Sequence, residues 1–469
     1  MMEKLKHLMI LVLCLGFTFT VLAGCSTDED AAGNESAGQE NEAVEVVTIT
    51  AQAPSPETTR VDNLVRAAEM LNEELEKEGQ NIRVEVETQM FEGSWEDYYR
   101  QFMLAFQSGK EPDIYVASHP NTGWLADGGY IQPLDELKES EAYADVYPVL
   151  WDAVTYKGHV WGAIQDTEAR PVFYNKNILR EMGWSEEEIE SLPEKVKNGE
   201  FTLDDLLRVA EEAVSSGAAK YGILHRPVNG PDFQVMLYNF GGQLYDPEEN
   251  KIVFDKEAVL KQLSFFHEIA QKNLIPEGLL SMEWSNIHSM VVNGEVLFYF
   301  GGIWNIYNWG QDDFHKELGK VDPEWVMENF GMMLYPAAEE GGQPITLSHP
   351  FAYFVSSNAE HKDLIVRLLE HVIHPDLQTI HNVETYHLPV TESAAEHPDY
   401  KANITLGDIA YMTEYTTFLP NHEGYEPYSN AVFKAIEAVQ LGRQTPEEAL
   451  EALEVQLKND LRDQLTILE

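Results

Sequence analysis

The pattern of apolar and polar positions predicts alternating strands and helices in the first ordered part of the chain. Residues 44–50 are rich in valine, isoleucine and threonine, and residues 82–86 alternate apolar with charged side chains, so both predict strands. Residues 112–116 predict a third strand, and residues 95–107 predict a helix before it. Another helix is expected between the first two strands, with an apolar face made of Val61, Leu64, Val65, Ala68, Leu71 and Leu75. This order predicts an α/β fold with a mostly parallel sheet, which binds ligands beyond the carboxyl ends of its strands.

Helix-start signals dominate the rest of the chain. Thr202 followed by Asp204 and Asp205 is typical of an N-cap with acids in the first turn. Thr445-Pro446-Glu447-Glu448 is a clearer case, with Thr at the N-cap, Pro at N1 and Glu at N3. The chain has 469 residues, more than one hydrophobic core usually organises, so two domains are expected.

The beginning of the chain predicts export. Lys4 and Lys6 precede an apolar run over residues 8–22, and the small residues Ala23-Gly24 stand before Cys25. This pattern is typical of a secretory signal, here residues 1–24, and the run is too short to span a bilayer as a stable helix. Because the small-residue site ends in Cys, it resembles the bacterial lipobox, which implies a lipid such as palmitate on Cys25. An ordinary signal peptide with a chance Cys is the alternative.

Residues 25–43 are predicted to form a flexible acidic tether, because residues 26–43 contain no aromatic or β-branched aliphatic side chain. Acids also dominate the whole chain, with 80 Asp and Glu against 31 Lys and Arg and a net charge of −49. Such a charge repels nucleic acid and anionic membranes. It suits either a solvated acidic surface in a saline or alkaline medium or the attraction of a cationic ligand.

The chain lacks the sequence motifs of several common enzyme classes. The chain contains no G-x-S-x-G, Walker A or G-x-G-x-x-G pattern, and residues 267–271 begin like a zinc-protease helix but end in Gln271. With 80 acids, carboxylate pairs at a glycosidase spacing arise everywhere and therefore carry no information. Cys14 would leave with the signal and Cys25 would carry lipid, so no disulfide is expected. We predict no catalytic residue, cofactor or metal.

Aromatic residues make up 11% of the chain, and several stand in turn-rich stretches, at 91–95, 300–305 and 425–428. Sugars present apolar C–H faces and a rim of hydroxyls. A sugar site therefore needs flat aromatic rings together with carboxylates, amides and arginines. The glycines around Trp304 favour this interpretation over simple core packing.

An ordered series of short motifs resembles the carbohydrate-binding solute-binding lipoproteins of bacterial ABC importers, the group that includes maltose-binding protein. The motifs lie at 108–114 (SGKEPDI), 158–162 (GHVWG) with 173–176 (FYNK), 239–242 (NFGG), 255–258 (DKEA), 290–295 (MVVNGE) with 302–304 (GIW), and 441–449 (LGRQTPEEA).

The resemblance implies a two-lobed, type II (Venus-flytrap) α/β fold with hinge crossovers and a ligand cleft between the lobes. The N-terminal lobe would comprise residues 44–166 and 350–397, and the C-terminal lobe residues 167–349 and 398–469. Ligand would bridge both lobes and so favour the closed state.

The same resemblance implies a set of binding residues. Trp304 matches the sugar-stacking Trp, and Tyr428 stands where relatives place another aromatic platform. Asp166 and Glu168 lie at the first hinge crossing, where Arg170 could pair with them, either for ligand binding or as a structural ion pair. The remaining candidates are polar or aromatic residues expected along the cleft: His119, Asn121, Asp232, Phe233, Trp95 and His349.

The function implied is that of an extracellular substrate-binding lipoprotein. It would be a monomer anchored by lipid at the outer face of the cell membrane, delivering a sugar or oligosaccharide to ABC permease subunits. Two alternatives stay open: a receptor for a cationic small solute, held in an aromatic cage, and a secreted glycoside hydrolase.

Overall fold

The computed structural model describes residues 44–469. The predicted signal peptide, Cys25 and the tether lie outside these residues. Within residues 44–469 no helix is long and apolar enough to cross a membrane.

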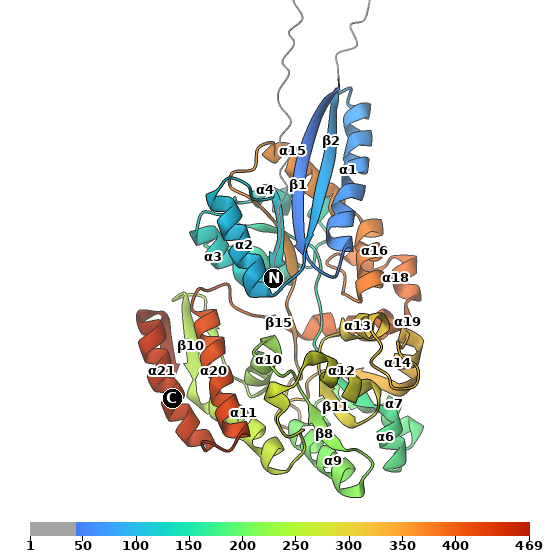
Figure 1. The fold of residues 1–469 in the computed structure, drawn as a ribbon, viewed down its shortest axis with the longest axis vertical. Helices are drawn as coiled ribbons and strands as arrows, with labels where there is room; N and C mark the ends of the chain where they lie inside the picture. Colours follow the sequence, from blue (N-terminus) through green and yellow to red (C-terminus); the bar gives the residue numbers. More distant parts are fainter. Residues whose placement is uncertain (1–43) are drawn as a thin grey trace, which may run out of the picture. The chain divides into compact units, whose positions relative to one another are not determined.

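The first sheet has five strands in the order β2-β1-β3-β14-β6. Figure 1 labels its first two strands, β1 and β2. These strands are β1 (Glu45–Pro54), β2 (Ile82–Phe91), β3 (Ile114–Ser118), β6 (Gly162–Ile164) and β14 (Phe351–Val355). β1 runs parallel to β2 and β3, whereas β14 runs antiparallel to both β3 and β6. The sheet is therefore mostly parallel, with one antiparallel strand contributed by a distant part of the chain.

The first two strands are longer than their hydrophobic patterns predict. β1 and β2 stay in register from Glu45–Ile82 to Pro54–Phe91. Near the end of this register the side chain of Gln52 donates a 3.1 Å hydrogen bond to Gln89. Pairing with a neighbouring strand thus extends both strands through polar residues that carry no strand pattern of their own.

Helices cover the first sheet. α1 (Thr59–Lys77) contacts α15 (Lys362–Val372) and α16 (Pro375–Thr385), and α2 (Trp95–Gln107) buries Tyr98 and Phe102. Shorter elements complete this region: η1 (His119–Asn121), α3 (Thr122–Asp127), α4 (Asp135–Glu139), η2 (Glu141–Tyr143), η3 (Pro148–Leu150), α5 (Trp151–Val154), β4 (Thr155–Tyr156), β5 (His159–Val160) and α17 (Glu392–Ala395).

The second sheet has the order β12-β7-β11-β8, and a smaller sheet has the order β16-β10-β9. Their strands are β7 (Val172–Asn175), β8 (Tyr221–Leu224), β9 (Tyr245–Asp246), β10 (Lys251–Asp255), β11 (Val296–Phe300), β12 (Phe330–Met333) and β16 (Leu465–Leu468). β13 (Thr346–Ser348) pairs with β15 (Thr416–Phe418). The helices here are α6 (Lys176–Glu181), α7 (Glu186–Glu190), α8 (Leu192–Lys197), α9 (Leu203–Ser216), α10 (Pro231–Asn239), α11 (Lys256–Gln271), η4 (Leu279–Ser281), α12 (Trp284–Val292), α13 (Asn305–Gln311), α14 (Pro323–Asn329), α18 (Pro398–Ala402), α19 (Ile404–Ile409), η5 (Ala410–Tyr415), α20 (Tyr425–Gln440), α21 (Pro446–Leu461) and η6 (Arg462–Gln464).

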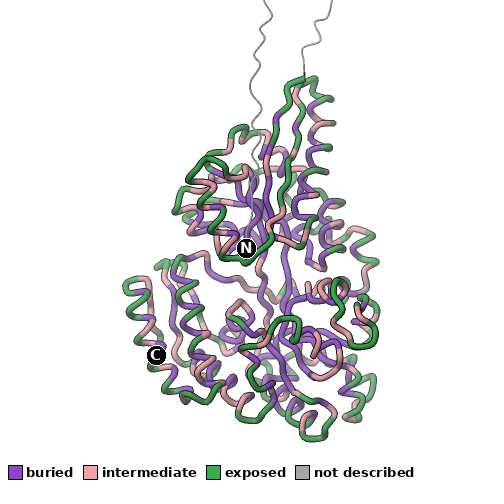
Figure 2. The backbone as a smooth tube through the Cα atoms, viewed as in Figure 1, coloured by how far each residue is buried: buried purple, intermediate pink, exposed green. Residues whose placement is uncertain are grey.

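Two separate hydrophobic cores correspond to the two main sheets, and both appear as buried segments in Figure 2. One core draws on residues between Val47 and Ile164 and again between Phe351 and Val390. The other draws on residues between Ala169 and Leu347, on Leu388, and on residues from Tyr400 onward. The chain therefore passes between the cores around residues 165–168, 348–350 and 388–400.

Candidate functional site

Buried polar residues join the two cores at the first crossing, between β6 and β7. Gln165, Asp166, Thr167 and Glu168 are all almost completely inaccessible to solvent. The Thr167 hydroxyl is hydrogen-bonded to the hydroxyl of Ser348, and its backbone exchanges hydrogen bonds of 3.1 and 2.8 Å with Leu388. Segments from three distant parts of the sequence thus lie side by side at this crossing.

Arg170 brings three of the predicted site residues together. Its Nη1 donates a 2.6 Å hydrogen bond to Asp232 Oδ1, and its Nη2 donates one of 2.6 Å to Glu168 Oε1. The guanidinium also lies 4.6 Å from the centre of the Trp304 ring, in cation–π geometry. Arg226 completes the group by donating 2.7 Å to Asp232 Oδ2. Glu168, Arg170, Asp232 and Arg226 are hereafter called the Arg170 cluster.

The two acids of the Arg170 cluster differ in their electrostatics. Burial would raise the pKa of Asp232, but Arg170 and Arg226 together hold that pKa below its usual value. Burial raises the pKa of Glu168 to about 7, because Arg170 only partly offsets the cost of burying this charge. Glu168 therefore changes protonation near neutral pH, whereas Asp232 stays ionised.

Asp166, the other predicted acid of the hinge, points into a different environment. Its Oδ2 lies 2.7 Å from Nη1 of Arg60 and 2.9 Å from Nε2 of His381, and its Oδ1 accepts a 3.0 Å hydrogen bond from the backbone of Phe351. Burial would raise the pKa of Asp166, but Arg60 and the neighbouring histidines hold it well below its usual range. The side chain is fully buried, so here it ties the hinge to α1 and α16 rather than facing solvent.

Asp166, His381 and His387 are the one group of acid and histidine side chains within residues 44–469 that lies close enough to hold a metal ion. Arg60 already supplies the positive charge at Asp166 Oδ2, and Nδ1 of His381 is hydrogen-bonded to Thr59 Oγ1 at 2.8 Å. A metal ion would have to displace that buried arginine. The residues present therefore fit a neutralised ion-pair network better than a metal centre.

His119 and His349 meet where β3 ends. Their ring centres are 5.2 Å apart, and Nε2 of His119 lies 3.1 Å from the carbonyl oxygen of Leu419. Burial lowers the pKa of His119 to about 3 and lowers that of His349 well below its ordinary value. Both rings are therefore neutral at physiological pH, and His119 links the two cores through the Leu419 carbonyl.

The Asn121 side chain is hydrogen-bonded to its neighbours, whereas Trp95 is open to solvent. The amide of Asn121 is already used within its own lobe, donating 2.8 Å to the Tyr99 hydroxyl and accepting 2.7 Å from Trp124 Nε1. Trp95, by contrast, is 48% exposed, and its ring lies 5.5 Å from that of Phe351 and stacks at 6.2 Å on Tyr99. Trp95 is thus an accessible aromatic platform on the N-terminal core.

The structure places Tyr428 and Phe233 in the second core. Each is 1% exposed, and both belong to the buried cluster that includes Val432 and Ile436. Tyr428 lies on the inward face of α20, and Phe233 packs against Phe266 and Phe433. Neither ring is accessible to a ligand in this conformation.

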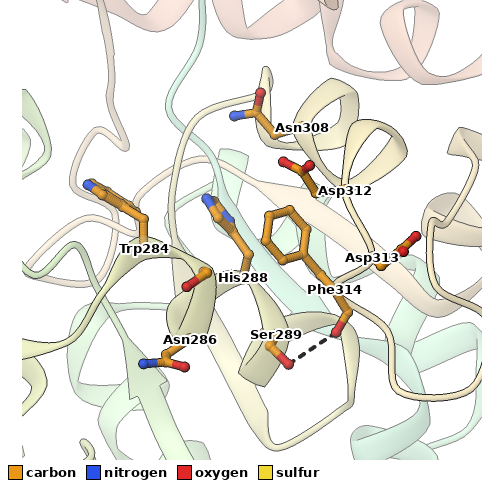
Figure 3. A pocket seen from close by; sticks show the side chains of 9 residues that line it. Trp284, Asn286, His288, Ser289, Asn308, Asp312, Asp313 and Phe314 are labelled. Atoms are coloured by element: carbon orange, nitrogen blue, oxygen red, sulfur yellow. Dashed lines mark hydrogen bonds between the residues drawn. The ribbon is translucent and has the colours of Figure 1, made fainter. Parts of the chain in front are cut away.

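Arg226 of the Arg170 cluster and the neighbouring Trp284 did not stand out in the sequence. Arg226 bridges Asp232 to Trp284, since its guanidinium lies 5.6 Å from the centre of the Trp284 ring. Trp284 in turn forms one wall of a pocket of about 710 Å³ (Figure 3). Trp284 begins a helix directly after an acidic residue and lies outside the glycine-rich turns. The criterion that singled out Trp304, an aromatic residue among glycines, therefore did not apply to Trp284.

Comparisons with known proteins agree with this architecture. The family model of the bacterial extracellular solute-binding proteins matches residues 62–379, more than half of the chain. A maltotriose-binding protein of Pyrococcus abyssi is 25% identical over 210 residues, which cover 45% of this chain and only 42% of that relative.

Solved structures match over greater lengths. The sugar-binding protein MalE of Xanthomonas citri has a TM-score of 0.72 at 19% identity, covering 88% of this chain and 97% of its own. The GacH receptor of Streptomyces glaucescens has a TM-score of 0.70 at 17% identity, covering 89% and 99%. These matches confirm the predicted two-lobed, type II periplasmic-binding-protein fold. On the strength of the family match, the chain belongs to the bacterial extracellular solute-binding proteins.

Proposed function

We propose that this protein is the substrate-binding component of an ABC importer and that its ligand is a sugar or oligosaccharide. The observation that carries the proposal is the half-buried Trp304 ring, fixed on one side by the guanidinium of Arg170 and flanked by the charged groups of the Arg170 cluster. A flat ring beside carboxylates and arginines suits the C–H face and hydroxyl rim of a sugar. The relative named for maltotriose and the GacH receptor, solved with acarbose, support the same ligand class.

The lobes are proposed to be residues 44–166 with 350–397 and residues 167–349 with 398–469. The two hydrophobic cores support this division, because their members change over near residues 165–168 and 348–350. Ligand would bind between the accessible Trp95 of the first lobe and Trp304 of the second, and closure would follow because the ligand contacts both. Tyr428 and Phe233, buried in the core, would then support the C-terminal lobe from behind.

The lipid anchor on Cys25 and the acidic tether over residues 26–43 are part of the same proposal. A tethered receptor stays near its transporter at high effective concentration. The protein would act as a monomer at the outer face of the cell membrane and hand its ligand to the permease subunits.

The decisive test replaces Trp304 with alanine. Isothermal calorimetry of the wild-type protein against maltose, maltotriose, maltotetraose, acarbose, cello-oligosaccharides and xylo-oligosaccharides would first define the best ligand. Burial of one face of a tryptophan against a sugar is worth about 2 kcal/mol, so Trp304→Ala should weaken that ligand roughly 30-fold.

Trp184→Ala is the matched control, because Trp184 is also half-buried but follows α6, away from the Arg170 cluster. Equal affinity of the Trp304→Ala variant and the wild type would refute the assignment of this ring. Failure of the wild type to bind any sugar of the panel would refute the proposed function.

A cationic solute is a second candidate, and the net charge of −49 is the observation that favours it. The positive charges of Arg170 and Arg226 beside Trp304 and Trp284 oppose it. A thermal-shift panel containing choline, glycine betaine and the same sugars would separate the two, since bound ligand raises the melting temperature by mass action.

A further inference from the structure

A pocket of about 710 Å³ lies between the first turn of α12 and the end of α13 (Figure 3). Its walls are Trp284 and His288 of α12, Asn308 of α13, and Asp312 and Phe314 just after α13. The volume falls within the range of small-ligand sites, and none of these five residues belongs to the matched motifs or to the Arg170 cluster.

The pocket has an aromatic wall. Trp284 is 39% exposed and stacks on His288, with ring centres 5.7 Å apart and planes at 21°. Phe314 lies 5.0 Å from the other side of His288, so the three rings form a continuous surface (Figure 3). An exposed tryptophan held in place by a stacked ring offers a rigid apolar face at little entropic cost.

The polar rim of the pocket has unused hydrogen-bonding capacity. Within the described part of the chain, the side chains of Asn308 and Asp312 form no hydrogen bond or ion pair with another side chain. His288 Nδ1 accepts a 3.1 Å hydrogen bond from Trp309 Nε1, and burial lowers the pKa of His288 to about 4. Neutral His288 therefore carries its proton on Nε2, which makes that atom a donor.

The pocket and Trp304 are connected through two sets of residues. Trp304 is the N-cap of α13, and Asn308 follows one turn later, with its backbone nitrogen donating 3.1 Å to the Trp304 carbonyl. On the other side, Arg226 links Asp232 of the Arg170 cluster to the ring of Trp284. A ligand longer than the Trp304 site could therefore reach Trp284 along one lobe.

We propose that the Trp284–His288–Asp312 pocket is a second sugar subsite, which makes the natural ligand an oligosaccharide rather than a monosaccharide. One sugar ring stacks on Trp284, its hydroxyls accept from His288 Nε2 and donate to Asp312, and Asn308 can do both. This rests on the proposed function. The mixed lining favours a neutral polyhydroxyl ligand, because Arg226 beside Trp284 opposes a cation, whereas Asp312 and Asp313 oppose an anion.

The test compares chain lengths. Calorimetry would measure malto-, cello- and xylo-oligosaccharides of one to seven units against the wild type and the Trp284→Ala, Asp312→Ala, Trp304→Ala and Trp184→Ala variants. In the wild type, affinity should rise with length. In Trp284→Ala and Asp312→Ala the ratio of long-chain to short-chain affinity should fall about tenfold. Asp312 is exposed, so its replacement leaves the core intact.

The variants separate the two proposals. Trp304→Ala should lower the affinity for short and long chains by the same factor, and Trp184→Ala should change neither. An unchanged length ratio in both pocket variants would overturn the second subsite while leaving the sugar-receptor function standing. If the wild type bound no sugar of any length, both proposals would fall together.

Discussion

Replacement of Glu168 by glutamine should remove a pH-dependent part of the protein's stability. The folded state raises the pKa of Glu168 from 4.5 to about 7, chiefly by burial, because Arg170 offsets only part of the cost. The folded protein thus holds this proton more tightly than the unfolded chain does. The resulting stabilisation is fully present below about pH 4.5 and is lost as the pH rises through 7.

The size of the effect follows from the same shift. A difference of this size is worth about 3 kcal/mol in total, most of which disappears between pH 5 and pH 8. The unfolding entropy of a protein as long as residues 44–469 is roughly 0.9 kcal/mol per kelvin. The lost stability therefore corresponds to a decrease of about 3 °C in melting temperature. Glutamine resembles the protonated acid, keeps an oxygen for Arg170 and cannot ionise.

The assay is differential scanning calorimetry at pH 5, 6, 7 and 8 at constant ionic strength. The melting temperature of Glu168→Gln, relative to the wild type, should rise by about 3 °C across this series. Glu451→Gln, at an exposed position of α21, is the control and should show no such trend. A difference that stays flat or falls with pH would mean that Arg170 outweighs burial, and the reasoning would be refuted.

Three other changes test separate parts of the account. Asp166→Asn should cost about 3 kcal/mol in urea unfolding, at the lower end for a broken buried ion pair, because Arg60 would keep only Glu57 as its counter-charge; a cost below about 1 kcal/mol would contradict the network. Thr445→Ala should cost about 1 kcal/mol, because it removes the capping box with Glu448, and an unchanged denaturation midpoint would show that the cap contributes nothing. Cys25→Ala should release a binding-competent protein into the medium of the producing cells, and its retention in the membrane fraction would exclude the lipid anchor.

Local sequence signals predicted several helix boundaries correctly. The helix predicted over residues 95–107 is α2 with the same ends, because Ser94 caps it and a glycine-containing turn follows. Thr202 and Thr445 are both N-caps, as their sequences predict, and in the structure each forms a capping box. These features depend on side chains within a few residues of each other, so the sequence contains all their partners.

The sequence did not predict which residues far apart in the chain contact each other. Asp166 and Glu168 are two residues apart and look equivalent as hinge acids. The tertiary structure gives Asp166 the charge of Arg60, more than a hundred residues away, whereas Glu168 shares Arg170 with Asp232. The two acids therefore have opposite pKa shifts. Tyr428 and Trp304 both stand in aromatic, turn-rich stretches, so the sequence did not distinguish them. In the structure Tyr428 is buried, whereas Trp304 is partly accessible.

The sequence by itself determined the α/β alternation, the helix caps, the acidic charge, and the family through an ordered set of motifs. Only the tertiary structure decided which acids are neutralised, which aromatic rings a ligand can reach, and that Trp284 has a pocket beside it. The reason is physical: caps and periodicity are set by neighbours along the chain, whereas burial and electrostatics depend on every group that folding brings near.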